Sequence, residues 1–399
     1  MHDVAVIGGG PGGLHIARLL AAGGFDVRVF EEHEMSGDPV HCTGVLAADA
    51  FDEFDLPREA ILNDLRTARF IAPSGHCISH TTATLEAVAV DRLSFDRRLF
   101  DSARAAGATL VPGRRATSVS VDRESVRIVL DGGATARSRV CVLACGANYS
   151  IQQRLGLGRP AVFLQSAQLE VPIGRPGDVE VHFGKAVAPG GFAWVVPVRR
   201  DPSQWCARVG LMSERDAAGG FRRFVRRIQD RLGLDTGPGA PLQPKRKMLP
   251  LAPISRTYTD RVVAIGDAAG IVKATTGGGI YYSLVSATLA AEVLGPALRT
   301  NRVGAATLQK YERAWRARLG REIEAQLELR TIAHRMDDRD IEALFELART
   351  DGIMPIVRRT AKFNHHRALI VALFRHPPAR RVLFDRLRAS GRRITRAAE

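Results

Sequence analysis

Strands and helices alternate in the first part of the chain. The apolar run Asp3–Ile7 has the length and β-branched residues of a strand buried on both faces, and Leu14–Ala22 follows it at helical spacing. A second apolar run, Val27–Phe30, comes next. The pattern predicts a strand–helix–strand unit of the kind that builds parallel sheets.

The same alternation returns later in the sequence. Val140–Ala147 is an apolar run that enters a glycine turn. Arg261–Ile265 is another, and the stretch from Leu284 to Leu294 after it has the spacing of a buried helix. We expect both runs to be strands of the N-terminal sheet.

The middle of the chain changes to short strands bounded by turns. A hairpin is predicted over Leu65–His80, and an antiparallel meander is predicted from the runs Phe163–Val171, Val179–Phe183, Phe192–Val198 and Trp205–Leu211. A sheet of this kind beside a cofactor domain would form the wall of a substrate cavity.

The remaining segments are predicted to be helical. Ser94 is a suitable N-cap for a helix that runs to about Ala106, and a basic helix is expected over Glu214–Leu232. From Ala305 onward the chain is helical, and Pro355–Phe374 is expected to be one helix. The mixture of apolar and basic residues in this last segment suits either a membrane interface or packing against other helices.

Composition places the chain among ordinary globular proteins with room for two domains. It has 399 residues, of which 45% are hydrophobic and 25% charged, and no apolar run is long enough to span a bilayer. Its five cysteines contain no C-x-x-C pair, so neither a disulfide framework nor a zinc ribbon is indicated. We expect no metal site, no secretory signal and a reducing cytoplasmic location.

The positive charge is concentrated in two stretches. The net charge is +15, and Phe221–Lys247 and Arg375–Glu399 each hold eight Lys or Arg against two acidic residues. No nucleic-acid motif accompanies the charge, so we expect no nucleic-acid partner. An anionic membrane surface, at the inner face of the cell membrane, is the better candidate. Solvated helix faces explain the charge equally well.

The N-terminal turn has the spacing of a dinucleotide fingerprint. Gly8, Gly10 and Gly13 satisfy G-x-G-x-x-G directly after the first strand, and Glu31 ends the second strand. In such a turn the first glycine allows the tight bend, the second admits the pyrophosphate and the third lets helix pack on strand. Glu31 is then placed to accept a hydrogen bond from a ribose hydroxyl.

A second glycine-rich segment, GDAAGIVKATTGGGIYY, runs from Gly266 to Tyr282. The Asp267 carboxylate would be repelled by a bare phosphate, but it can accept a hydrogen bond from a sugar or polyol hydroxyl. Gly277 and the two glycines after it would let the backbone lie flat against a planar ring. This late segment, paired with an N-terminal fingerprint, suits a flavin.

Four other residues are candidates with two interpretations each. Cys42 lies in the turn His-Cys-Thr-Gly, where spacing alone favours a buried thiol over a role beside the flavin. Arg92 could reach the cofactor or form a surface salt bridge. Phe192 and Trp194 share one face of a strand, which could line a substrate cavity or belong to the core beneath a helix.

The chain resembles the geranylgeranyl reductase family of FAD-dependent enzymes, in the larger group that includes p-hydroxybenzoate hydroxylase. The motifs that carry the resemblance are GGGPGG, PVHCTG, VDRLSFDRRL, GFAWVVP and GDAAGIVKATTGGGIYY, and they cover nearly the whole length. Two departures concern the substrate region: Ala274 stands where the family usually has Pro, and Phe192 where Tyr is common.

The resemblance implies FAD as cofactor and reduction of C=C bonds in an apolar polyprenyl chain. Gly8, Gly10, Gly13, Glu31, Arg92 and Asp267 would hold FAD, with Gly277 and Gly278 along its ring system. Cys42 would be a catalytic residue, and Phe192 and Trp194 would line the substrate tunnel. NADPH or ferredoxin would supply electrons. The head group of the substrate and the oligomeric state are not specified.

Other functions were weighed against this one. A flavin monooxygenase shares the fold and differs only in its chemistry. A flavin halogenase resembles the chain at FAWVVP but needs an active-site lysine early in the sequence, and the first lysine here is Lys185. A non-catalytic lipid-binding protein is a third alternative, which the intact fingerprints disfavour.

These observations predict an α/β fold with a discontinuous domain organisation. A Rossmann-type FAD-binding domain of the p-hydroxybenzoate hydroxylase type is expected at 1–64, 85–160 and 255–300. An antiparallel β-sheet substrate domain is expected at 65–84 and 161–254, and a C-terminal helical region with a basic tail at 301–399.

Overall fold

A mixed β-sheet, the first sheet, carries both glycine-rich turns at the ends of its strands. The computed structural model describes residues 1–175, 177–234, 242–350 and 352–384. The strands lie in the order β17 (Tyr258–Thr259), β18 (Val262–Ala264), β11 (Thr135–Leu143), β1 (His2–Ile7), β2 (Val27–Phe30) and β8 (Thr109–Val111), with β10 (Val126–Leu130) and β9 (Ala116–Val121) continuing from β11. From β18 to β8 neighbouring strands are parallel, as the alternating pattern predicts.

Helices cover the first sheet and bury its apolar strands. They are α1 (Pro11–Ala22), α3 (Arg92–Ala105), α4 (Ser150–Arg154), α6 (Ile280–Arg299) and α7 (Ala305–Trp315). Helix α1 packs against both α3 and α6. The prediction that Ser94 caps α3 is wrong, because the Asp91 side chain accepts hydrogen bonds from the Leu93 and Ser94 backbone N–H groups and starts the helix earlier.

The second sheet contains the predicted meander. Its order is β16 (Lys245–Pro250), β12 (Phe163–Pro172), β15 (Trp205–Ser213), β14 (Phe192–Arg199), β13 (Val179–His182), β5 (Thr67–Ile71) and β6 (Cys77–Thr81). All pairings are antiparallel except that of β13 with β5. One face of this sheet packs against α5 (Ala217–Leu232), which begins later than predicted because Asp216 caps it at Gly219.

A small sheet links the first two. It consists of β3 (Val45–Ala47), β7 (Ala87–Val90) and β4 (Ile61–Leu65), with the short helix α2 (Ala50–Glu53) and a 3-10 turn, Arg58–Ala60, beside it. The helix expected to follow Gly44 is therefore a strand and only one helical turn.

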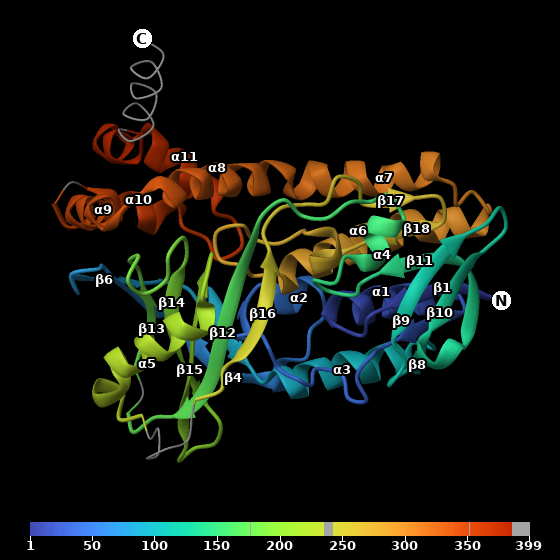
Figure 1. Cartoon of the computed structure of the whole chain (residues 1–399), viewed down its shortest axis with the longest axis horizontal. Coiled ribbons are helices and arrows are strands. Elements are labelled where there is room, and N and C mark those ends of the chain that lie inside the picture. Colours follow the sequence, from blue (N-terminus) through green and yellow to red (C-terminus); the bar gives the residue numbers. More distant parts are fainter. Residues whose placement is uncertain (176, 235–241, 351, 385–399) are drawn as a thin grey trace, which may run out of the picture.

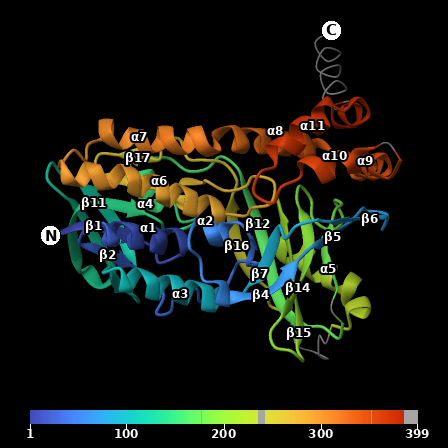
Figure 2. The same ribbon diagram turned by 180° about the vertical axis from the view of Figure 1, so that it is seen from behind.

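The C-terminal helices run along one side of both large sheets (Figures 1 and 2). After α7 and a π-helical turn, Arg316–Gly320, come α8 (Arg321–Arg335), α9 (Asp338–Thr350), α10 (Ile353–Thr360) and α11 (Arg367–Arg375). Residues 377–384 are helical again. No described helix has both the length and the apolar character needed to cross a membrane.

The prediction of a single helix over Pro355–Phe374 is wrong. Helix α10 ends at Thr360 and α11 begins at Arg367. Residues 361–366 leave the helical path, and Asn364 and His366 form hydrogen bonds with Tyr282 and Thr275. These tertiary contacts override the local helical pattern. Most of the predicted basic tail, 385–399, lies outside the described residues.

Candidate active site

The three fingerprint glycines sit in the turn between β1 and α1 and have different surroundings. Gly8 has a φ of 109°, and a Cβ there would collide with the Ala144 carbonyl. A Cβ at Gly13 would collide with the carbonyl of Gly8. At Gly10 a Cβ would meet nothing within 4 Å. The turn is therefore closely packed on two sides and open where a pyrophosphate would approach.

Glu31 follows β2 and reaches back to this turn. Its Oε2 accepts a hydrogen bond of 2.6 Å from the Gly9 N–H, and its Oε1 lies 2.6 Å from Nδ1 of His33. The carboxylate is thus held at the edge of the glycine turn, in the position from which a ribose hydroxyl could be bound.

The two glycine-rich segments meet at one residue that the sequence analysis missed. A Cβ at Gly12 or at Gly266 would collide with the side chain of Ser283, on the first turn of α6. Ser286, one turn further on, accepts a hydrogen bond of 3.0 Å from the Gly266 N–H. Two small polar residues in an otherwise apolar helix were the available signal. They bring the fingerprint and the late segment into one site.

Asp267 lies in the 3-10 turn Gly266–Ala269 that follows β18. Its Oδ2 is 3.5 Å from Nζ of Lys247, and a Cβ at Gly279 would collide with its Oδ1. The chain therefore folds back over Asp267 at the last glycine of the late segment. Lys247 comes from β16, and nothing in its sequence context marks it.

Cys42 and Arg92 lie next to each other. The Cys42 sulfur accepts a hydrogen bond of 3.4 Å from the Gly44 N–H and interacts with the Arg92 guanidinium. Arg92 also pairs with Asp96 at 2.7 Å, and Asp96 is fully buried, so the surface salt bridge considered from the sequence is a buried one. Burial opposes the charge of Arg92, but Asp96 and then Cys42 outweigh it and raise its pKa above the usual value.

Arg208, on β15, fixes the turn that carries Cys42. Its side chain is 2% exposed, and its Nη1 donates to the carbonyls of Thr43 at 2.6 Å and Val90 at 2.9 Å. Its Nε donates to Glu170 at 2.9 Å. The second sheet thus positions the cysteine turn of the first, which no local pattern could reveal.

Phe192 and Trp194 lie on the face of β14 that points away from α5. Their rings meet edge to face with centroids 5.9 Å apart. They pack with the buried residues Leu164, Met212, Leu251, Val272 and Ala274. A Cβ at Gly277 would lie 3.0 Å from Leu249 and 3.7 Å from the Met212 sulfur. The structure therefore brings this apolar wall directly to the glycines of the late segment.

Unpaired polar atoms mark the space beside these residues. Within the described part of the chain, the buried atoms Nε1 of Trp194 and Nδ1 of His41 have no hydrogen-bond partner. Burial, and then Lys247 and Lys245, lower the pKa of His41. Buried polar groups normally have partners, so a bound group is expected here. The open face at Gly10, the Glu31 carboxylate and these atoms together fit FAD.

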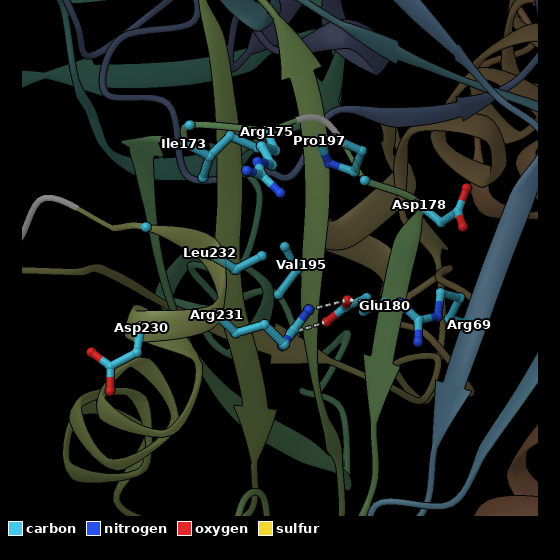
Figure 3. Close-up of a pocket in the computed structure, with 13 residues that line it drawn as sticks. Arg69, Ile173, Arg175, Asp178, Glu180, Val195, Pro197, Asp230, Arg231 and Leu232 are labelled. Carbon is cyan, nitrogen blue, oxygen red and sulfur yellow. Dashed lines mark hydrogen bonds and ion pairs between the residues drawn. The ribbon is translucent and has the colours of Figure 1, made fainter.

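A cavity elsewhere in the molecule does not belong to this site. It has a volume of about 530 Å³ and lies between β13, β14 and the end of α5 (Figure 3). Val195 and Pro197 line it, and these residues alternate along β14 with Trp194 and Val196. The cavity is therefore on the other face of the second sheet, and the Glu180–Arg231 ion pair occupies part of its wall.

Comparisons with known proteins agree with this arrangement. Residues 2–166 match the pyridine nucleotide-disulphide oxidoreductase family. Digeranylgeranylglycerophospholipid reductase of Methanocaldococcus jannaschii is 29% identical over 87% of this chain and 90% of its own length. Digeranylgeranylglycerophospholipid reductase 2 of Methanothermobacter thermautotrophicus is 30% identical, over 86% and 90%.

Solved structures show the same fold. A geranylgeranyl bacteriochlorophyll reductase-like protein from Thermoplasma acidophilum superimposes with a TM-score of 0.82 at 23% identity, over 97% of this chain and 98% of its own. The halogenase PltM in complex with FAD gives 0.67 at 15% identity, over 94% and 87%. These likenesses confirm the predicted fold class, and the sequence relatives establish that the chain belongs to the geranylgeranyl reductase family of FAD-dependent oxidoreductases.

Proposed function

We propose that the protein is an FAD-dependent reductase that saturates C=C bonds of a polyprenyl chain on a lipid. The observation that carries this proposal is the contact between the apolar wall and the glycines: Met212 and Leu249 lie against Gly277, with Phe192 and Trp194 beside them. An isolated alkene has no polar group to bind, so it must be placed by apolar contacts against the ring that reduces it.

The chain's own residues supply binding, orientation and exclusion of water. Gly8, Gly10 and Gly13 would receive the pyrophosphate at the N-terminus of α1, and Glu31 a ribose hydroxyl. Asp267 would accept a hydrogen bond from a hydroxyl of the flavin side chain, and Gly277 and Gly278 would lie along the ring system. When bound and reduced, FAD supplies the hydride that the alkene accepts.

Cys42 is proposed to shape proton delivery or alkene placement. Its sulfur lies beside the buried Arg92 on a turn held by Arg208, so the thiol has a fixed position. Cys42→Ser should leave FAD bound while changing the rate or the number of bonds reduced, as measured by mass spectrometry of the products. Cys42→Ala with unchanged products and rate would remove the cysteine from the mechanism. Arg92 is proposed to contribute to FAD binding through the same turn.

The decisive experiment is turnover without oxygen. Photoreduced enzyme is mixed anaerobically with a digeranylgeranylglycerophospholipid, and the flavin absorbance and product masses are followed. Oxidised flavin should return and each reduced bond should add two hydrogens. Reoxidation that needs O₂ and gives hydroxylated or epoxidised product would replace this proposal by the monooxygenase alternative. NADPH and ferredoxin are the two electron donors to compare in the same assay.

An anionic membrane surface is proposed as a second partner, at the inner face of the cell membrane. Residues 352–384 hold seven Lys or Arg and no Asp or Glu. Helices α10 and α11 each bury only one residue, Ile353 and Ile370, so their other apolar side chains are at least partly accessible. Basic, amphipathic helices of this kind suit the interface of a membrane that contains the substrate.

A further inference from the structure

Lys273 is a buried amine at the start of the late glycine turn. Its side chain belongs to a residue only 4% exposed, between the buried Val272 and Ala274. Its backbone closes the turn: the Lys273 N–H donates to the Gly278 carbonyl at 3.1 Å, and the Gly277 N–H donates to the Lys273 carbonyl at 2.8 Å. The residue is thus part of the turn proposed above to lie along the flavin.

The Lys273 side chain runs behind the glycines and leaves the turn. A Cβ at Gly278 would lie 2.7 Å from Cε of Lys273, so the lysine stem covers that glycine. Its Nζ donates to the Phe363 carbonyl at 3.1 Å and to Oδ1 of Asn364 at 3.3 Å, and lies 4.1 Å from the centroid of the Phe363 ring. Both acceptors belong to residues 361–366, which we call the connecting segment because it joins α10 to α11.

Other contacts hold the connecting segment in the same place. The Asn364 carbonyl accepts a hydrogen bond of 3.3 Å from the Tyr282 hydroxyl, and Nδ1 of His366 lies 2.6 Å from Oγ1 of Thr275. Glu322 of α8 accepts hydrogen bonds from the N–H groups of His366 and Arg367. The connecting segment therefore touches the turn at its start, the helix after it and the C-terminal helices.

Packing alone does not explain an amine at this position. Burial lowers the pKa of Lys273 to about 7, although the Asp49 and Glu322 carboxylates favour its charged form. A methionine of similar length would fill the space without the cost of burying an amine. What the lysine adds is the pair of hydrogen bonds to Phe363 and Asn364, which join two segments far apart in sequence.

We propose that Lys273 is a positioning residue that couples the flavin-facing glycine turn to the connecting segment between α10 and α11. This proposal rests on FAD lying along Gly277 and Gly278. FAD that orders the turn would then order the connecting segment as well, and α10 and α11 would report on the flavin site without touching it.

Hydrogen–deuterium exchange of the full chain, with and without FAD, tests the coupling. In the parent protein FAD should slow exchange in the connecting segment by about fivefold or more. Lys273→Met should still bind FAD through the N-terminal fingerprint, but exchange in the connecting segment should no longer respond to FAD. Lys362→Met is the matched control, since that lysine is exposed and pairs with Glu86, and it should keep the FAD effect.

Two results would overturn the coupling: an FAD effect of unchanged size in Lys273→Met, or no FAD effect in the parent. If Lys273→Met does not fold, Asn364→Ala removes one acceptor only, and it should reduce the FAD effect, an unchanged effect again counting against the coupling. Failure of alkene reduction in the anaerobic assay would overturn the proposed function while leaving the exchange result intact, so the two are separable.

Discussion

The three glycines of the N-terminal turn lack side chains for different physical reasons, and this difference can be tested. Gly10→Val should fold, because a Cβ there meets no atom within 4 Å, but its side chain would occupy the pyrophosphate approach. FAD binding should weaken at least about 100-fold, which corresponds to about 2.8 kcal/mol. Fluorescence titration with FAD, together with a thermal melt, measures both properties.

Gly13→Ala is the matched variant. Its Cβ would collide with the Gly8 carbonyl, so it should lower the melting temperature before any FAD is added. A Gly10→Val protein that is folded and as yellow as the parent would show that the fingerprint has been assigned to the wrong cofactor.

The sequence predicted residues whose role depends on local geometry. The glycine spacing and Glu31 could be identified because a strand, a turn and a helix must follow one another there. Ser283, Arg208 and Lys273 could not, because each acts through a residue more than sixty positions away or on another sheet. Asp91 replaced Ser94 as helix cap because both residue types suit that position and only the backbone decides between them.

Elements with strong periodicity were predicted well, and those held by tertiary contacts were not. The strands of the meander and the helix α1 follow their hydrophobic pattern. The segment from Pro355 to Phe374 has a helical pattern throughout, but hydrogen bonds from the connecting segment to Tyr282 and Thr275 interrupt it. The discontinuous domain boundaries stay a prediction.

The contact between β13 and α5 gives an element-scale prediction about pH. Burial by itself raises the pKa of Glu180, but hydrogen bonds from His182 and Arg231 outweigh it and lower the pKa to about 2. The folded pKa lies below the ordinary value of 4.5, so the contribution to stability is complete above about pH 4.5 and is lost as the pH falls through about 2.

Glu180→Gln should therefore lower the free energy of unfolding by about 1–2 kcal/mol near neutral pH. Urea denaturation of parent and variant should show this difference shrinking as the pH falls below about 4.5. Glu346→Gln, which breaks an exposed pair with Arg349, should have a smaller effect. A difference of constant size down to about pH 2 would mean that the Glu180 carboxylate charge is not what joins the strand to the helix.

At the scale of the whole molecule, the flavin site and the C-terminal helices form one continuous structure. The aromatic row continues from Phe192 to Phe183, with centroids 6.2 Å apart, and from Phe183 to Phe345 of α9 at 6.0 Å. The connecting segment joins the glycine turn to α10 and α11 on another side. A lipid chain that enters from a membrane would therefore meet apolar side chains from α9 to Trp194.

The membrane contact predicts which basic surface matters. Arg358, Arg359 and Arg375 are exposed on α10 and α11, where Arg359 and Arg375 border a groove of about 390 Å³ with an apolar floor that includes Ile356 and Val371. Each cation near an anionic bilayer contributes about 1 kcal/mol. Changing all three to Gln should therefore weaken binding to anionic liposomes by about 100-fold at low salt.

The matched control changes the same number of exposed arginines on the other basic helix, α5, namely Arg222, Arg226 and Arg227. Liposome flotation of parent and both variants should show strong binding only to anionic vesicles, a loss only in the α10–α11 variant, and a decline for the parent as salt rises, because salt screens exposed charges. Equal flotation with neutral and anionic vesicles would contradict an electrostatic contact. An equal loss in the α5 variant would instead assign the binding to the net charge of the molecule and leave α10 and α11 without a special role.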